Sequence, residues 1–254
     1  MLLRGFVVFG RVLCLFYMDD ATKEVLRNKE IWFIPAAIVL AGAILAITVY
    51  GYRKQEVIVT TQGDVSLMRP LSPIDHILGN PKAPVVLVTY TDIDSSFSEA
   101  FQATMDQITT EYAPSGNFAW VYRHLPLLDK HQNAAKHAEA AECVASLSNE
   151  QNFWLFIRSL QAKTPEGGQF NPRDYEAIVE SVGIDATAFK GCLASQKFQT
   201  RVSGDFANGL SAGAGGSPFS ILLVSGKEPI TIDGAVPYDG MKKIIDKALS
   251  EIIL

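Results

Sequence analysis

The sequence lacks Cys-x-x-Cys, the pair of neighbouring cysteines on which thiol redox chemistry depends. Its three cysteines, Cys14, Cys143 and Cys192, are separated by long stretches of chain, and three are too few for the disulfide framework of a small secreted domain. Redox chemistry at an internal pair of neighbouring thiols is therefore excluded. A basic excess is lacking as well, because the formal net charge is −5. We therefore expect no surface for the phosphate backbone of a nucleic acid.

Charge is scarce along the whole chain, at 19% of residues, and the apolar surplus is concentrated in one place. Residues 31–52 (IWFIPAAIVLAGAILAITVYGY) carry no charge, and this run is long enough to cross a hydrocarbon core of about 30 Å as a helix. Aromatic side chains stand at both ends of the run, and no small-x-small cleavage site ends it. We predict an uncleaved transmembrane helix over residues 31–52, with the lipid bilayer as its partner. A buried globular helix and a signal peptide are the alternatives.

The segments around this run complete the predicted organisation. Residues 1–30 form a tail whose Arg4 and Arg11 favour a cytoplasmic N-terminus, and our hypothesis is that residues 1–17 are an extension ahead of a true start at Met18. Residues 53–78 contain prolines and little periodicity, which indicates a linker. Residues 79–254 have the length of a single domain. With the N-terminus inside, this domain is expected outside the cytoplasm, in the periplasm or at the cell surface.

The domain has an α/β pattern. Residues 85–91 form a β-branched, apolar run typical of a strand buried on both faces, and residues 95–112 carry apolar side chains at helical spacing. Further strands are predicted over residues 117–126, 219–225 and 229–233, and further helices over residues 134–145, 152–161, 172–182, 187–195, 198–211 and 238–253. The order βαβ, helical block, ββα predicts a thioredoxin-like fold with an inserted helical subdomain at about residues 129–213.

Seven short segments resemble one known family, the DsbA-like thiol oxidoreductases. They follow in order as residues 79–85 (GNPKAPV), 90–94 (YTDID), 122–127 (YRHLPL), 131–134 (HQNA), 138–143 (AEAAEC), 189–193 (FKGCL) and 215–219 (GGSPF). The resemblance covers about residues 79–254. It implies a thioredoxin fold with a helical insert, export from the cytoplasm, and disulfide exchange with substrate proteins.

The chain departs from that family at the redox site itself. Where the family has Cys-Pro-x-Cys at the start of a helix, this sequence has Ser95-Ser96-Phe97-Ser98. A helix N-terminus stabilises a thiolate and so makes a cysteine a nucleophile and a leaving group, whereas a serine hydroxyl cannot form a disulfide. The positions Ser95 and Ser98 are therefore degenerate redox positions, and no catalytic residue is assigned.

Three readings of these serines stay open. Ser95 or Ser96 is a helix N-cap, with Ser96 and Glu99 forming a capping box. Alternatively, Ser95 donates a hydrogen bond to a bound thiolate, as the resemblance to kappa-class glutathione transferases implies. The third reading is a laboratory replacement of cysteine by serine, although the whole drifted segment favours natural loss.

The second half of the inherited site is Pro218. The resemblance implies a cis peptide bond between Ser217 and Pro218, with the backbone of Ser217 facing a substrate chain; an ordinary trans turn is the alternative. Binding by strand-like pairing needs main-chain groups and no thiols. We therefore expect extended or unfolded polypeptide to bind at Ser95, Ser96, Phe97, Ser217 and Pro218.

The contexts of Cys143 and Cys192 are found among some DsbA-like proteins, which implies a structural disulfide and an oxidising compartment. Two buried free thiols are the alternative. His131 and His137 are six residues apart, a spacing that puts them on different helix faces, so no metal site is expected. No cofactor is expected either. Asp92 resembles the acid that tunes the thiols of the family, and here it has no evident proton partner.

The sequence as a whole predicts a membrane-anchored, extracytoplasmic protein without dithiol redox activity that binds polypeptide in a chaperone-like or scaffold role. The alternative is an enzyme, either a disulfide oxidoreductase or isomerase, or a serine-assisted glutathione or thiol transferase.

Overall fold

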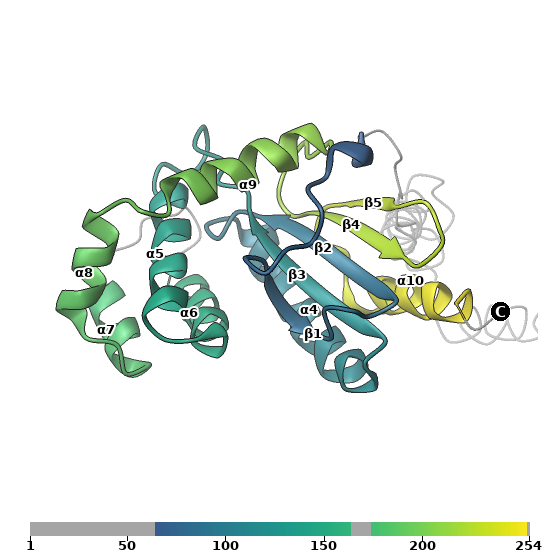
Figure 1. Ribbon diagram of the computed structural model, residues 1–254, viewed down its shortest axis with the longest axis horizontal. Helices are drawn as coiled ribbons and strands as arrows, with labels where there is room; N and C mark the ends of the chain where they lie inside the picture. Colours follow the sequence, from purple (N-terminus) through teal and green to yellow (C-terminus); the bar gives the residue numbers. More distant parts are fainter. Residues whose placement is uncertain (1–63, 164–173, 253–254) are drawn as a thin grey trace, which may run out of the picture. The chain divides into compact units, whose positions relative to one another are not determined.

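The computed structural model describes residues 64–163 and 174–252 (Figure 1). Within these two ranges, none of the helices combines the length and hydrophobicity that crossing a membrane requires. The transmembrane helix predicted over residues 31–52, the tail before it and Cys14 lie outside the described residues.

A mixed five-stranded sheet forms the centre of the domain, with the strand order β1-β3-β2-β4-β5. Its strands are β1 (His76–Gly79), β2 (Val85–Thr91), β3 (Phe118–His124), β4 (Phe219–Val224) and β5 (Ile230–Asp233). Strands β2 and β3 are parallel and the other neighbours are antiparallel. The β2 and β3 side chains are buried on both faces of the sheet, as their continuous apolar runs predicted.

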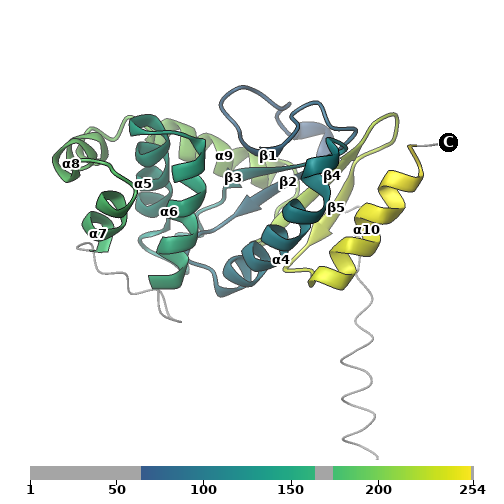
Figure 2. The ribbon, with the colours of Figure 1, turned by 90° about the horizontal axis from the view of Figure 1, so that it is seen from below.

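Helices cover both faces of this sheet. Below it in Figure 2, α4 (Ser96–Tyr112) and α10 (Tyr238–Ser250) lie side by side. Their apolar stripes pack with Leu87 and Trp120 in the larger core. On the opposite face, Val88 and Val121 pack with residues that follow α9 (Gln199–Ser211) and with the short helix η2 (Val65–Leu67). Side chains alternate between the two faces along each strand, so successive residues of β2 and β3 pack in two separate cores.

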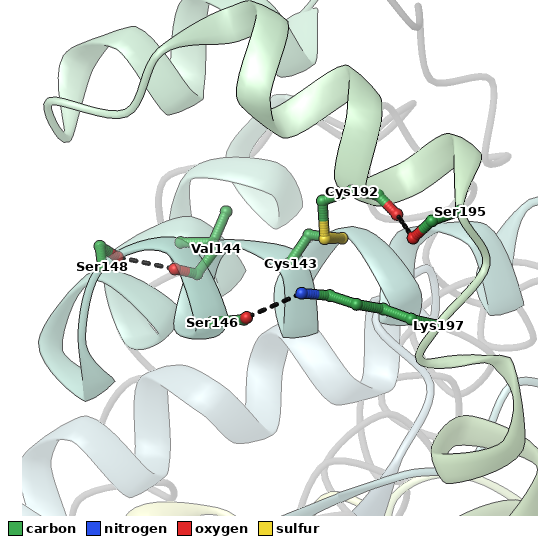
Figure 3. Close-up of a disulfide and its surroundings, with 7 residues drawn as sticks. All are labelled: Cys143, Val144, Ser146, Ser148, Cys192, Ser195 and Lys197. Carbon is green, nitrogen blue, oxygen red and sulfur yellow. Dashed lines mark hydrogen bonds between the residues drawn. A yellow bond between two sulfur atoms is a disulfide. The ribbon is translucent and has the colours of Figure 1, made fainter.

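The helical insert lies at one end of the sheet (Figures 1 and 2). It contains α5 (Ala134–Leu147), α6 (Glu150–Lys163), α7 (Asp174–Ser181) and α8 (Ala186–Ala194), and α9 leads back to the sheet. A disulfide joins Cys143 of α5 to Cys192 of α8 across a sequence separation of 49, with their Cα atoms 5.9 Å apart. Close to the disulfide in Figure 3, Lys197 Nζ donates a hydrogen bond to Ser146 Oγ.

The predicted thioredoxin-like order with a helical insert is confirmed, and the predicted elements end within a few residues of the observed ones in the described ranges. One strand was not predicted. Strand β1 pairs antiparallel with β3, so residues 76–78 of the predicted linker belong to the sheet. The close pairing requires glycine at its end, because Gly79 has a φ of +102° and a Cβ there would lie 2.5 Å from the Phe118 carbonyl oxygen.

Candidate functional site

The first component of the site is the start of α4, directly after β2. Ser95 is the N-cap residue, with φ −80° and ψ 126°, and its side chain makes no capping hydrogen bond. Ser96 is already the first helical residue, so the predicted capping box of Ser96 with Glu99 is wrong. Ser95 and Ser98 are buried, whereas Phe97 projects with 67% of its surface exposed. The helix start therefore presents an aromatic ring to solvent and keeps Ser95 and Ser98 inside.

A chain of polar contacts connects this helix start to the loop before β4. Ser98 Oγ lies 2.8 Å from Ser217 Oγ, and Ser217 Oγ accepts a hydrogen bond of 2.6 Å from the Asp92 backbone N–H. The predicted cis peptide bond between Ser217 and Pro218 is confirmed. The hydroxyl of Ser98 in α4 thus joins the start of this helix to the loop before β4. The sequence singles out Ser217 for its backbone, and in the structure its side chain makes both of these contacts.

Two buried aspartates beside α4 are each paired with a histidine. Asp92, 1% exposed, accepts hydrogen bonds from the Leu127 backbone at 2.8 Å and from His131 Nδ1 at 2.9 Å. Asp94 is likewise bonded to His137 Nδ1. Asp92 therefore does have a proton partner, contrary to the expectation from sequence. The two histidines do not share a helix either, because His131 precedes the first residue of α5.

The negative charges of these aspartates affect the pKa of the buried Tyr122 phenol. Burial raises the pKa of Tyr122 well above its ordinary value, and the nearby carboxylates of Asp92 and Asp94 raise it further. The phenol therefore stays neutral and does not act as a base near neutral pH.

A groove of about 560 Å³ opens beside these loops, between the start of α4 and the edge strand β5. It contains three of the five residues predicted to bind polypeptide, which are Phe97, Ser217 and Pro218; Ser95 and Ser96 are not among its lining residues. The remaining lining residues are Gly213, Gly215, Gly216, Phe219, Thr231, Asp233 and Gly234. The glycines leave backbone accessible along one wall, and the volume falls within the range of about 300–1,000 Å³ typical of ligand sites.

A second polar cluster lies between the sheet and the insert. Glu142 Oε1 meets His76 Nε2 at 3.1 Å and His124 Nε2 at 3.0 Å, and Glu142 Oε2 pairs with Arg201 at 2.8 Å. Burial alone would raise the pKa of Glu142, but the hydrogen bonds from His124 and His76 lower it to about 2. These bonds join β1, β3, α5 and α9, which indicates a structural role. In the described parts of the chain, no group of three or more His, Cys, Asp or Glu side chains has the arrangement of a metal site.

Sequence reasoning missed Thr231 and Asp233 in the groove and the two aspartate–histidine pairs. In β5, Thr231 and Asp233 alternate with Ile230 and Ile232. This alternation was the signal in the sequence that one face of the strand is polar. No local pattern connects residues 92 and 131, because their contact is made by the fold.

A family model described as "Thioredoxin" matches residues 72–247. Among solved structures, the crystal structure of Wolbachia pipientis alpha-DsbA1 is similar with a TM-score of 0.64 and 19% identity, covering 75% of this chain and 98% of that one. BdbD from Bacillus subtilis in its oxidised form has a TM-score of 0.60 and 21% identity, covering 76% of this chain and 98% of that one. At this identity the two structures establish a shared fold.

The curated relatives have a different description. "Na(+)/H(+) antiporter NhaA 1" of Salinispora arenicola is 28% identical over 167 residues, which are 65% of this chain and 24% of the antiporter. "Na(+)/H(+) antiporter NhaA 3" of Salinispora tropica is 29% identical over 154 residues, 60% of this chain and 22% of the antiporter. The chain thus matches about a quarter of the length of these relatives.

Proposed function

The chain belongs to the thioredoxin family and has the DsbA-like fold, and on that premise we propose that its domain binds extended or unfolded polypeptide without exchanging disulfides. In this proposal residues 31–52 anchor the protein in a membrane and the domain works outside the cytoplasm, in a chaperone-like or scaffold role. An oxidising compartment agrees with the disulfide between Cys143 and Cys192.

The proposed loss of dithiol chemistry is supported by the residues at the helix start and by the bonding of Cys143 and Cys192. The helix start that activates a thiolate in active relatives carries Ser95 and Ser98 here, and an alcohol at a helix N-terminus neither ionises near neutral pH nor forms a disulfide. Cys143 and Cys192 are bonded to each other and at most 9% exposed. A substrate thiol therefore meets no reactive sulfur in the described domain.

The observation that carries the binding proposal is the groove beneath Phe97. It is lined by Pro218, Phe219 and the exposed Phe97, and one side is the edge strand β5. An edge strand offers unpaired backbone N–H and C=O groups to an extended chain. Aromatic and apolar walls supply the area that such a chain buries.

The groove is tested with two substitutions in the full chain, purified in detergent. Phe97→Ala removes the exposed ring, and Gly216→Phe fills the groove; a Cβ at Gly216 meets no atom within 4 Å, so this variant is expected to fold. Leu155→Ala, an exposed apolar truncation on α6, is the matched control. Fluorescence anisotropy with reduced, alkylated lysozyme is expected to show binding that is about tenfold weaker in both groove variants, from a loss of about 1.4 kcal/mol, and unchanged in the control. Equal binding by all variants would place the polypeptide elsewhere and overturn the proposal.

The enzymatic alternatives are tested by activity. Insulin reduction and the refolding of scrambled ribonuclease are measured with the unmodified chain and with Ser95→Cys/Ser98→Cys, which restores the thiol pair and serves as the positive control. We expect turnover only in the double variant. Conjugation of glutathione to an aromatic halide tests the serine-assisted transferase. Turnover above background by the unmodified chain in any of these assays would refute the binding-only proposal.

The curated relatives favour a second candidate function, a domain that acts beside a membrane cation transporter. The observation is that a segment similar to this chain makes up 24% of a protein described as a Na(+)/H(+) antiporter. The test is sodium-driven proton movement in membrane vesicles of the native host, with and without this chain. A change in exchange rate that Gly216→Phe abolishes supports the candidate, and an identical rate in both vesicle preparations contradicts it.

A further inference from the structure

The start of α4 carries a serine hydroxyl that the groove beside β5 leaves unused. Ser95 is the N-cap residue of this 17-residue helix, and its side chain makes no capping hydrogen bond. The residue is only 7% exposed, and a hydroxyl in such a position normally has a partner. Among the described residues, the polar atoms that lack both a partner and solvent contact do not include Ser95 Oγ. A ligand at the helix end can therefore reach this hydroxyl.

Two backbone N–H groups at the same helix end are also available. The N–H groups of Ser98 and Glu99 donate to the Ser95 carbonyl, whereas those of Ser96 and Phe97 donate to no residue in the described part of the chain. Ser96 and Phe97 are both exposed. Unpaired N–H groups and the helix dipole give this end a partial positive charge. One hydroxyl and two N–H groups thus stand ready to donate at the start of α4.

These donors fit a carboxylate. An ionised carboxylate accepts hydrogen bonds on two oxygens, and its charge is favoured at a helix N-terminus. Phe97, which carries one of the N–H groups, also lines the groove, so an anion at the helix end lies next to a chain in the groove. Every polypeptide ends in a main-chain carboxylate, and unpaired backbone N–H groups are a recurring means of capturing it.

Three acidic side chains near the helix start oppose an anion. Asp92 and Asp94 are buried, and each is paired with a histidine. Glu99 is exposed in the first turn of α4, where its charge is screened by salt. Replacing Glu99 by a neutral residue is therefore expected to strengthen the binding of a carboxylate, so the site can be tested by a gain of affinity as well as by a loss.

We propose that the N-terminus of α4 binds the C-terminal carboxylate of a polypeptide whose preceding residues lie in the groove. The carboxylate accepts hydrogen bonds from the Ser95 hydroxyl and from the backbone N–H groups of Ser96 and Phe97. This inference rests on the proposed polypeptide binding and adds the part of the polypeptide that is recognised, which is a free chain end.

The test uses three short labelled peptides of one sequence rich in valine and threonine, titrated into the full chain in detergent micelles. The first has a free C-terminal carboxylate, the second has a carboxamide in its place, and the third has the carboxamide and a glutamate at its centre. We expect the free carboxylate to bind about tenfold more tightly than the carboxamide and the central glutamate to bring no such gain. The difference is expected to fall at high salt.

Variants of the chain assign the effect to the helix end. Ser95→Ala is expected to reduce the preference for the free carboxylate several-fold, and Ser95→Thr to retain it. Because the Ser95 side chain makes no capping bond, the alanine variant is expected to fold, which its melting temperature checks. Glu99→Gln is expected to increase the preference. Ser203→Ala, which removes an exposed hydroxyl on α9, is the matched control and leaves the preference unchanged.

The outcomes distinguish this inference from the function on which it rests. Equal affinity for the free and amidated peptides, with both lost in Gly216→Phe, would overturn recognition of the chain end and leave polypeptide binding intact. A preference that neither Ser95→Ala nor Glu99→Gln changes also overturns the inference, because the carboxylate then lies elsewhere. If reduced, alkylated lysozyme binds and no peptide does, the chain end is not recognised and the proposed function stands. If nothing binds, both fail.

Discussion

Removal of the Cys143–Cys192 disulfide is expected to lower the stability of the domain by an amount that follows from its place in the chain. The bond closes a loop with a sequence separation of 49, for which the loss of chain entropy in the unfolded state corresponds to about 4 kcal/mol at 25 °C. This is a large share of the roughly 5–15 kcal/mol that stabilises a typical domain. In Cys143→Ala/Cys192→Ala, we expect the melting temperature to fall by about 8–16 °C, at about 2–4 °C for each kcal/mol.

The measurement is urea and thermal unfolding of the full chain followed by circular dichroism, with free energies compared at equal slope. Treatment of the unmodified chain with a reductant is the matched control and is expected to reproduce the shift of the double variant. Peptide binding at the groove is expected to persist at low temperature, because α5 and α8, which carry the cysteines, contribute no lining residue to it. A double variant whose free energy of unfolding is within about 1 kcal/mol of that of the unmodified chain would refute the entropy reasoning.

The remaining predictions concern the polar cluster and the core. The pKa of Glu142 is lowered from 4.5 to about 2, so its contribution to the free energy of unfolding is complete above pH 4.5 and is lost as the pH falls toward 2. Burial opposes a charged His76, but its hydrogen bonds with Glu142 and Glu150 raise its pKa above 6.5. The contribution of His76 is therefore complete below pH 6.5 and is lost as the pH rises through the raised pKa. The urea midpoint should therefore decline on both sides of about pH 4.5–6.5, and a cluster that titrates with no effect on this profile contradicts the assignment. Glu142→Gln is expected to cost about 3–5 kcal/mol because it removes the buried counter-charge of His76 and Arg201, and a cost below about 1 kcal/mol in the same assay argues against that pairing. Leu87→Ala, a change at a fully buried position between sheet and helices, is expected to cost about 2–5 kcal/mol, and a smaller loss means that the core closes around the cavity.

Local pattern was enough to predict the elements that carry the fold. The uninterrupted apolar run of β2 and the helical spacing in α4 and α10 are signals within single segments, and they give the βα and ββα units in order. Strand β1 was not predicted because it has only four residues, His76–Gly79, which are partly buried and follow a proline-containing stretch. Its identity as a strand depends on the edge of β3, which no local pattern reveals.

The site divides in the same way between local and long-range information. Short motifs placed Ser95, Ser98 and Pro218 at the centre, because a helix start and a loop before a strand are continuous in sequence. The partners of these positions come from distant segments: His131 reaches Asp92 across 39 residues, and Ser98 meets Ser217 across 119. Such contacts form only after the sheet has brought its strand ends together.

The serine hydroxyls also explain how the segments around the site are held together. A thiol is a weak hydrogen-bond donor, whereas a hydroxyl donates and accepts strongly, so the contact of Ser98 with Ser217 at 2.8 Å can hold the helix start against the loop of Pro218. Ser217 is in turn fixed by the Asp92 backbone N–H, at the end of the central strand β2. The groove is therefore bounded by segments that are hydrogen-bonded to one another. Replacing Ser217 by alanine removes both contacts and leaves the other lining residues of the groove unchanged, so we expect weaker peptide binding in this variant. Unchanged affinity in the Ser217→Ala variant would contradict a role of these contacts in holding the groove.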